Sequence, residues 1–390
     1  MGRRRMLQQL GLWMGASLIT PASMAQVIGN TFEGIKLVPV AAAAGRFMGW
    51  PANNGCWHWD QGREILVGYE EGPWLDQPGH KIGNPQSKRL ARSLDGGRTW
   101  SQEIPEPFVG RETLPRYAAR GVRFDHPDFA LRLAVGGALD PRDRVGRFFV
   151  SYNRGRRWRG PYRLSGLDNE PRLRGLVMTS RTDVVVTGRR SALLMMSAVD
   201  PGLGEFTHRL DKPFVAQTLD GGRSFQFLSW IVPWSDPYRA VMPSTVLAGP
   251  DRLITTLRRR NPRNHEQPNW VDAYGSEDGG ASWAFLSRVG ETGVGNGNPP
   301  SLTWLGDRRL ACAYGDRSKG QIILRISSDE GRTWGQEHGI RQIPFSRDFG
   351  YPRMVRNHRR ELVIIYYLAT EYMPNSYIEA ALVDGRTISS

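Results

Sequence analysis

Lysine is scarce in this chain of 390 residues. Only five of its 52 basic residues are lysine and 47 are arginine, and with 38 acidic residues the formal net charge is +14. The arginines are spread along the sequence and are not gathered in one tail, which argues against a nucleic-acid-binding tract. Guanidinium groups hold carboxylates through two parallel hydrogen bonds. We therefore expect an anionic small ligand and no nucleic acid.

Cysteine, long apolar runs and sustained helical periodicity are also lacking. The two cysteines, Cys56 and Cys312, lie far apart, so their pairing stays open, and no Cys/His spacing typical of a metal site occurs. We expect no metal and no other cofactor, although the sequence leaves calcium binding open. No apolar stretch reaches the roughly 18 residues that a membrane span needs. Short strand-like runs bounded by Gly, Pro, Asp or Asn favour an all-β protein.

The first 25 residues are predicted to be an export signal. Arginines at positions 3–5 precede a short apolar run over residues 10–19, and small residues lead up to Ala25. This order is typical of a cleavable signal, and the paired arginines resemble the twin-arginine type, with a general secretory signal as the alternative. We expect cleavage after Ala25, a single domain over residues 26–390, and a periplasmic or secreted protein.

One eight-residue motif recurs through the chain. It reads SLDGGRTW at 93–100, TLDGGRSF at 218–225, SEDGGASW at 276–283 and SSDEGRTW at 327–334, with a degraded copy, SYNRGRRW, at 151–158. The copies start 51 to 67 residues apart. This period corresponds to one four-stranded antiparallel sheet per copy, which is the unit of a β-propeller.

The motif suits a hairpin turn better than a catalytic site. Its Asp can accept hydrogen bonds from backbone N–H groups of the turn, its Gly permits a backbone conformation that other residues resist, and its terminal aromatic ring can pack between neighbouring sheets. Identical carboxylates at a fixed period indicate fasteners of the fold, and they do not name a reaction.

The blade number follows from the period. Residues 26–390 divided by the repeat length predict a six-bladed propeller, with seven blades as the alternative. Strand-like runs occur at 64–68, 131–136, 147–152, 183–187, 252–257, 309–314, 322–327 and 361–367. We expect the last strands, ELVIIYY and YIEAALVD, to complete a sheet begun by the N-terminal segment. Such closure removes free sheet edges.

Segments that recur about once per blade, outside the hairpin turns, should line the centre of the ring. They lie at 45–59, 125–129, 181–183, 242–244, 257–260, 297–301, 314–317 and 350–353. Together with the repeated turns, Tyr-Gly-Asp-Arg at 314–317 and Gly-Tyr-Pro-Arg at 350–353 make the chain resemble the sialidase (neuraminidase) superfamily over the whole predicted domain. The chain also resembles a bacterial branch of this superfamily that includes rhamnosidases and rhamnose–glucuronate lyases.

The resemblance implies a set of site residues. Sialidases hold the sugar carboxylate with three arginines, use a Tyr nucleophile assisted by Glu, and use an Asp as acid/base. The candidates that it implies for the arginines are Arg46, Arg258 or Arg260, and Arg317. Tyr351 corresponds to the nucleophile and Asp76 to the acid/base, with His80 in the same stretch as an alternative. Further candidates for contacts with the sugar are Asn54, Trp57, Tyr314 and Arg353.

The chain also departs from the sialidase pattern. The usual Arg-Ile-Pro is absent at Arg46, and no Glu occurs between Glu205 and Glu266, where the partner of the tyrosine is expected. A Tyr attacks well only when a base activates it. A lyase would instead need a base such as His58, His80 or a Tyr, and an Arg to neutralise the substrate carboxylate.

Three functions follow from these residues. The first is an exported sialidase-like glycoside hydrolase that acts on a carboxylate-bearing glycan. The second is a lyase or rhamnosidase acting at rhamnose–glucuronate linkages. The third is a propeller that binds glycans without cleaving them. In each case we expect a carbohydrate partner and a monomer.

Overall fold

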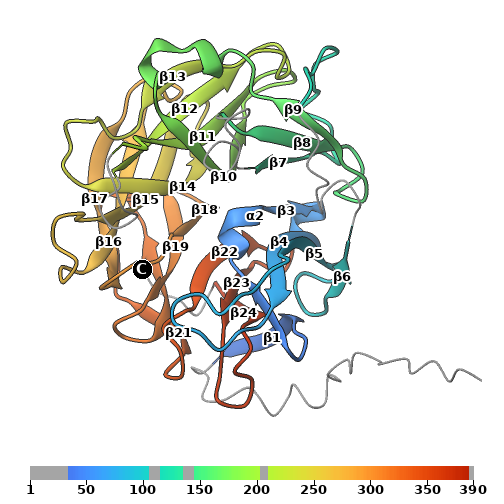
Figure 1. Cartoon of the computed structure of the whole chain (residues 1–390), viewed down its shortest axis with the longest axis vertical. Coiled ribbons are helices and arrows are strands. Elements are labelled where there is room, and N and C mark those ends of the chain that lie inside the picture. The colour runs from blue at the N-terminus through green and yellow to red at the C-terminus, as the bar shows by residue number, and fades with distance from the viewer. Residues whose placement is uncertain (1–33, 105–114, 135–144, 203–209, 386–390) are drawn as a thin grey trace, which may run out of the picture.

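Six β-sheets form a ring in the computed structural model, which describes residues 34–104, 115–134, 145–202 and 210–385 (Figure 1). The predicted six-bladed, all-β propeller is therefore confirmed. The predicted export signal falls outside the described residues and stays a prediction. No helix among the described residues is both long enough and apolar enough to cross a membrane.

Each blade is an antiparallel sheet built from strands that follow one another in the chain. Blade 1 has β2 (Arg46–Gly49), β3 (Cys56–Trp59), β4 (Glu64–Pro73), β5 (Ser87–Ser93) and β6 (Ser101–Glu103). Blade 2 has β7 (Ala130–Ala134), β8 (Arg147–Ser151) and β9 (Arg159–Arg163), and blade 3 has β10 (Val177–Val186), β11 (Ala192–Val199), β12 (Asp211–Thr218) and β13 (Gln226–Trp230).

The second half of the ring has the same plan. Blade 4 has β14 (Arg239–Leu247), β15 (Leu253–Arg260), β16 (Asn269–Ser276) and β17 (Ala284–Gly293). Blade 5 has β18 (Ser301–Gly306), β19 (Arg309–Asp316), β20 (Gln321–Ser327) and β21 (His338–Gln342). Blade 6 has β22 (Gly350–Arg356), β23 (Glu361–Leu368) and β24 (Tyr377–Asp384).

The N-terminal strand closes the ring. β1 (Ile35–Ala41) pairs antiparallel with β24, from Ile35 opposite Val383 to Ala41 opposite Ile378, and so becomes the outermost strand of blade 6 (Figure 1). The predicted joining of the two ends of the chain in one sheet is confirmed. The first and the last described strands hold the ring together because backbone hydrogen bonds link them directly.

The repeated motifs form tight turns that their own side chains fasten. In the copy at 327–334 the Ser327 hydroxyl accepts a hydrogen bond from the N–H of Gly331 at 2.8 Å, and Asp329 accepts from Thr333 N–H at 2.9 Å and from the Thr333 hydroxyl at 2.6 Å. The copies that begin at 93, 218 and 276 repeat this pattern. The motif Gly in all four has a positive φ, between +74° and +95°. The expected roles of Ser or Thr, Asp and Gly in the turn thus agree with its geometry.

The aromatic residue that ends each motif packs between neighbouring blades. The indole N–H of Trp283 in blade 4 donates to the Ser229 hydroxyl of blade 3 at 3.2 Å, and that of Trp334 in blade 5 donates to the Ser287 hydroxyl of blade 4 at 3.0 Å. Both rings are partly buried against apolar clusters shared by two blades. Burial of such rings stabilises the contact between sheets.

Several of the inner strands have an irregular backbone. The pairing register shifts in β10 between Ser180 and Val184, in β14 between Val241 and Ser244, and in β22 between Gly350 and Arg353. A single helical turn, α2 (Pro51–Asn54), lies between β2 and β3. Bulges of this kind redirect side chains and are frequent beside functional sites. The centre of the ring is therefore the candidate location of a functional site.

Candidate functional site

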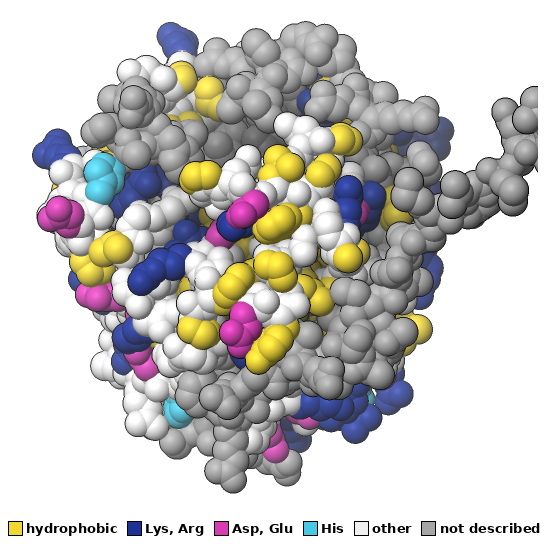
Figure 2. Space-filling model, turned by 60° about the horizontal axis from the view of Figure 1, so that its bottom comes forward, with side chains coloured by type: hydrophobic (Ala, Val, Ile, Leu, Met, Phe, Trp, Pro, Cys, Tyr) yellow, Lys and Arg dark blue, Asp and Glu magenta, His cyan; other side chains and the backbone are white. Residues whose placement is uncertain are grey.

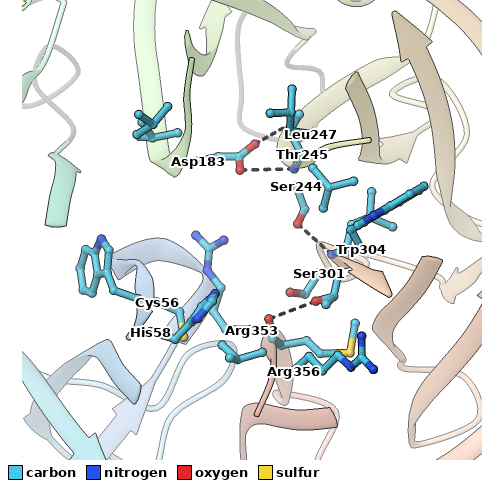
Figure 3. A pocket seen from close by; sticks show the side chains of 18 of the residues that line it. Cys56, His58, Asp183, Ser244, Thr245, Leu247, Ser301, Trp304, Arg353 and Arg356 are labelled. Atoms are coloured by element: carbon cyan, nitrogen blue, oxygen red, sulfur yellow. Dashed lines mark hydrogen bonds between the residues drawn. The ribbon is translucent and has the colours of Figure 1, made fainter. Parts of the chain in front are cut away.

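Two hollows lie at the centre of the ring. The first, here called the entry hollow, has a volume of about 710 Å³ and is bordered by residues 76–81, 296, 317 and 345–348. These are the loop after β4, the loop after β19, and the loops that lead into β18 and β22. The second, the channel hollow, has a volume of about 530 Å³ and lies between the inner strands of the blades (Figure 3).

Tyr351 lies next to the entry hollow, within a group of arginines. Its side chain is 7% exposed, and its hydroxyl oxygen accepts a hydrogen bond from Nη1 of Arg258 at 3.2 Å. Nη2 of the same guanidinium donates to Asn296, which borders the hollow, at 2.6 Å. The charges of Arg317 and Arg181 also act on the tyrosine. Three blades thus direct positive charge at one phenol.

The ionisation of Tyr351 reflects these charges. Burial favours the neutral phenol, but the guanidinium groups of Arg258, Arg317 and Arg181 outweigh it and lower the pKa of Tyr351 below its ordinary value. Burial lowers the pKa of Arg258 as well, to about 10, which still leaves it charged at neutral pH. A tyrosine that ionises readily is suited to act as a nucleophile or as a base.

The backbone of Tyr351 is strained. Its φ is +50°, a left-handed conformation that is unfavourable for a residue other than glycine, and Pro352 follows it. The N–H of Tyr351 donates to Oδ1 of Asn298 at 3.0 Å, and a Cβ on Gly350 would come within 2.2 Å of the same oxygen. Met242, before Pro243 in β14, has φ +59°. The Met-Pro and Tyr-Pro pairs therefore mark bulges of the inner strands.

Arg317 brings a partly unpaired guanidinium to the entry hollow. It is 9% exposed, and its Nε and Nη2 have no hydrogen-bond partner among the described residues. Nη2 lies 3.8 Å from the Asp348 carboxylate, which is too long for a hydrogen bond. A buried guanidinium with unused donors at the wall of a hollow is suited to an anionic ligand.

His80 and Asp348 form a pair at the edge of the entry hollow. Nδ1 of His80 lies 3.0 Å from Oδ1 of Asp348, and that oxygen also accepts a 2.5 Å hydrogen bond from the Tyr367 hydroxyl. The His80 ring packs edge-on against Trp50, with 4.9 Å between the ring centroids. The side chain of His80 is 41% exposed, so it is oriented by the protein and yet can reach a ligand.

Asp76 lies in the same loop but farther into solvent. Its side chain is 75% exposed and accepts a hydrogen bond from Lys81 at 2.6 Å. The structure therefore brings together five of the residues chosen from the sequence, which are Asp76, His80, Arg258, Arg317 and Tyr351.

Three other candidates lie at the channel hollow. His58, Trp57 and Arg353 line it. Arg353 donates from Nη2 to the backbone oxygen of Ala52 at 2.7 Å, and the indole of Trp57 donates to the oxygen of Leu131 at 3.1 Å. Water reaches His58 within the hollow, but the surrounding protein desolvates the ring and lowers its pKa. None of the three borders the entry hollow, and the charge of Arg353 interacts with that of Arg181.

The last four candidates border neither hollow. Arg46 pairs with Glu71 at 2.7 Å, Tyr314 is fully buried with its hydroxyl on Glu337 at 3.2 Å, and Asn54 is buried and donates to the Trp50 oxygen at 3.4 Å. Arg260 is 4% exposed. We leave these four residues out of the site.

Sequence reasoning did not select three polar residues that the fold places here. Arg181 lay in a segment expected to face the centre, but nothing in its local sequence distinguishes it from the other arginines. Asn296 and Asp348 are in loops without a motif, and their roles come only from their contacts with Arg258 and His80. The cysteines remain separate, and both Cys56 and Cys312 are free thiols.

Comparisons by sequence identify no relatives. No family model and no curated protein matches the chain. Solved structures do match it. A protein of unknown function from Dyadobacter fermentans has a TM-score of 0.65 at 16% identity, with 90% of this chain and 99% of that chain covered.

Two further matches are enzymes of known activity. The Hadza microbial sialidase Hz136 has a TM-score of 0.57 at 14% identity, with 88% of this chain and 66% of that chain covered. The α-L-arabinanase of Penicillium chrysogenum, solved with arabinobiose, has a TM-score of 0.54 at 12% identity, with 91% of this chain and 100% of that chain covered. At such low identity these matches show a shared propeller fold and nothing about the substrate.

Proposed function

We propose that this protein is an exported enzyme that cleaves a carboxylate-bearing glycan at the entry hollow. The observation that carries the proposal is the convergence of Arg258, Arg317 and Arg181 on Tyr351. Their charges lower the pKa of the phenol although its burial raises it. Propellers of the same fold include a sialidase and an arabinanase, which supports a carbohydrate as the substrate.

The arginines have the properties of a carboxylate clamp. Arg258 and Arg317 are 3% and 9% exposed, so a carboxylate that reaches them is shielded from water and its attraction to them is strong. The unused Nε and Nη2 of Arg317 form an edge of the planar fork that pairs with two carboxylate oxygens. A neutral sugar would bring no anionic acceptor to the unused Nε and Nη2 of Arg317.

The hydrolytic step assigned to Tyr351 is nucleophilic. As the phenolate, its oxygen attacks the anomeric carbon, the bond from that carbon to the leaving oxygen breaks, and the leaving oxygen takes a proton from His80 or Asp76. Water then attacks the same carbon, returns a proton to that residue and releases Tyr351 as the phenolate. His80 is favoured as the proton donor, because Asp348 orients its ring while Asp76 points to solvent.

A lyase is the second candidate, and one contact favours it. Among the described residues, Arg258 is the hydrogen-bond partner of the Tyr351 hydroxyl, and no carboxylate bonds to it as a base would in a hydrolase of the sialidase type. In elimination, Tyr351 removes the proton beside the substrate carboxylate and the arginines stabilise the resulting charge. The glycosidic oxygen then leaves from the neighbouring carbon and takes a proton from His80 or from the Tyr351 phenol, and an unsaturated sugar forms.

Product analysis on acidic oligosaccharides tests both candidates. We expect the wild type to cleave a sialic acid-terminated or a rhamnose–glucuronate oligosaccharide, and Tyr351→Phe and Arg317→Ala to lower kcat/KM by about 100-fold or more, as loss of a charge-stabilising donor does. Mass spectrometry separates hydrolysis, which adds water, from elimination, which adds none and creates ultraviolet absorbance.

The matched control is Arg223→Ala, which removes an exposed arginine from a repeat turn. It should retain wild-type activity, and all three variants should keep the melting temperature of the wild type within a few degrees. Full activity in Tyr351→Phe would refute the proposed mechanism. Saturable binding of these oligosaccharides without turnover would instead indicate a glycan-binding propeller.

A further inference from the structure

The channel hollow is lined by all six blades. Its wall consists of residues 56–58 of β3, 129–131 around the start of β7, 183, 184 and 186 of β10, 244–247 of β14, 301–304 of β18 and 353–356 of β22. Its volume of about 530 Å³ lies within the range of about 300–1,000 Å³ that is typical of sites for small ligands. It is distinct from the entry hollow, since the two share no lining residue.

Fixed hydroxyl and carboxylate groups face this space. Both oxygens of Asp183 are held by Thr245, through its N–H at 3.3 Å and its hydroxyl at 2.9 Å (Figure 3). The Ser244 hydroxyl oxygen accepts a hydrogen bond from the N–H of Leu302 at 2.9 Å, so its own proton is left to donate. Ser301, on the next inner strand, is 3% exposed, and its hydroxyl lines the hollow. These groups are positioned before any ligand arrives.

The channel hollow is lined by charges of both signs, whereas the charges that lower the pKa of Tyr351 are all positive. Arg353 and Asp183 attract each other across the hollow, and Figure 3 shows the guanidinium extending toward the carboxylate. Arg356 uses Nη1 to donate to the backbone oxygen of Leu305 at 2.8 Å. An anion would meet Asp183 here, whereas a neutral ligand would meet donors and acceptors together.

Apolar surface lies beside these polar groups. Trp57 and Trp304 are half-buried residues of the wall, and Val184 and Leu131 line it as well. Each tryptophan also packs against an apolar cluster between two blades. A sugar ring has hydroxyl groups around its edge and C–H groups on its faces, so its recognition requires hydrogen-bonding side chains next to aromatic ones. We propose that the channel hollow is a second ligand site, which binds a neutral saccharide.

Binding of a saccharide at the channel hollow does not depend on the proposed cleavage of a glycan at the entry hollow. The two hollows share strands, because β10 carries both Arg181 and Asp183, and β22 carries both Tyr351 and Arg353. In β10 both residues lie within the bulge between Ser180 and Val184, and in β22 Tyr351 lies within a bulge that ends at Arg353. One member of each pair belongs to the Tyr351 cluster and the other lines the channel hollow. A protein without catalytic activity could still bind sugar at the channel hollow, and an active one could fail to do so.

Binding of methyl glycosides to the full chain tests the proposal. The probes are the methyl glycosides of L-rhamnose, L-arabinose and D-glucose, measured by saturation-transfer NMR and by the quenching of tryptophan fluorescence. We expect saturable binding of at least one probe. Trp304→Ala should weaken it about tenfold, and Trp304→Phe should weaken it less, because the ring is retained.

A second variant covers the case in which Trp304→Ala disturbs the fold. Asp183→Asn keeps the shape of the side chain and one acceptor oxygen for the Thr245 N–H but removes the charge that opposes Arg353, and it should weaken binding several-fold. Arg317→Ala, which alters the entry hollow, should bind the probe like the wild type.

Three results would overturn the inference. The first is no saturable binding of any probe at millimolar concentrations. The second is binding that Arg317→Ala abolishes and the channel variants leave intact, since the probe would then occupy the entry hollow. The third is tighter binding of methyl glucuronide than of the neutral probes in the channel, which would contradict the neutral class of ligand.

Discussion

At the scale of single residues, the ionisation of one tyrosine distinguishes the site. Burial raises the pKa of most of the tyrosines in the core, among them Tyr69, Tyr314, Tyr366 and Tyr377. Tyr351 is equally enclosed, yet its pKa is lowered because three guanidinium groups act on it. The sequence nominated the tyrosine and two of these arginines. The sequence does not show the short distances in space between the tyrosine and the arginines, on which their interaction depends.

A spectroscopic titration tests this contrast. In the wild type, one tyrosine should ionise at a lower pH than the others, as followed by phenolate absorbance, and Tyr351→Phe should remove that step. Arg317→Gln should move the step upward by roughly one pH unit, because one of three nearby positive charges is lost. Arg353→Gln, on the same strand but at the channel hollow, should leave the step in place. A step insensitive to Arg317 would contradict the assignment.

At the scale of elements, the repeated turn works as a self-contained fastener. Its Asp accepts hydrogen bonds from the backbone and from a hydroxyl of the same turn, so contacts within the eight residues largely determine the conformation of the turn. Burial opposes the ionisation of Asp329, but the hydrogen bonds from Thr333 and Ser327 outweigh it and lower its pKa. The degraded copy keeps part of the pattern with Asn153, which accepts from Arg157 N–H at 2.8 Å.

Substitution of Asp329 tests the turn. Asp329→Ala should lower the free energy of unfolding by about 1–2 kcal/mol, because several hydrogen bonds are lost, and Asp329→Asn should lower it less. A carboxyl with a lowered pKa in the folded state stabilises the fold above its unfolded pKa, and the effect disappears as the pH falls through the folded pKa. The difference between wild type and Asp329→Asn should therefore shrink below about pH 4.

Urea unfolding at a series of pH values measures this difference. Arg332→Ala, an exposed change in the same turn, should have little effect. A constant difference between wild type and Asp329→Asn across the pH series would exclude the ionised carboxylate as its source.

At the scale of the whole molecule, the ring depends on the contact between β1 and β24. Leu37, Val38 and Val40 of β1 are each no more than 6% exposed, and they pack into two separate apolar clusters. The net charge of +14 is distributed over the surface, and on the face in Figure 2 basic side chains lie at several separate places among acidic and apolar ones. The positive charge important for the site is inside the ring.

Truncation tests the closure. A chain that begins at residue 42 lacks β1 and should lose several kcal/mol of stability, since each buried Leu or Val contributes about 1.5–3 kcal/mol. That is a large part of the 5–15 kcal/mol typical of a folded domain. A chain that begins at residue 34 keeps every described strand and is the control. Calorimetry should show a much lower melting temperature for the shorter chain alone, and equal values for both would refute the role of β1.

The sequence by itself determined the architecture. A motif that folds through its own side chains, repeated at the spacing of one sheet, predicted six blades, and the apolar strands at both ends predicted the closure. Local hydrogen bonding and alternation of apolar residues are enough for such inferences, because each depends on residues close together in the chain.

Only the tertiary structure decided which arginines belong to the site. Arg181, Arg258 and Arg317 come from three blades, and their charges meet at Tyr351 because the ring brings distant strands together. Arg181 and Tyr351 lie in bulges of the inner strands. The same packing placed Arg46 and Tyr314 against Glu71 and Glu337, away from both hollows. Electrostatic interactions depend on distance in space and on burial, and neither is a property of the linear sequence.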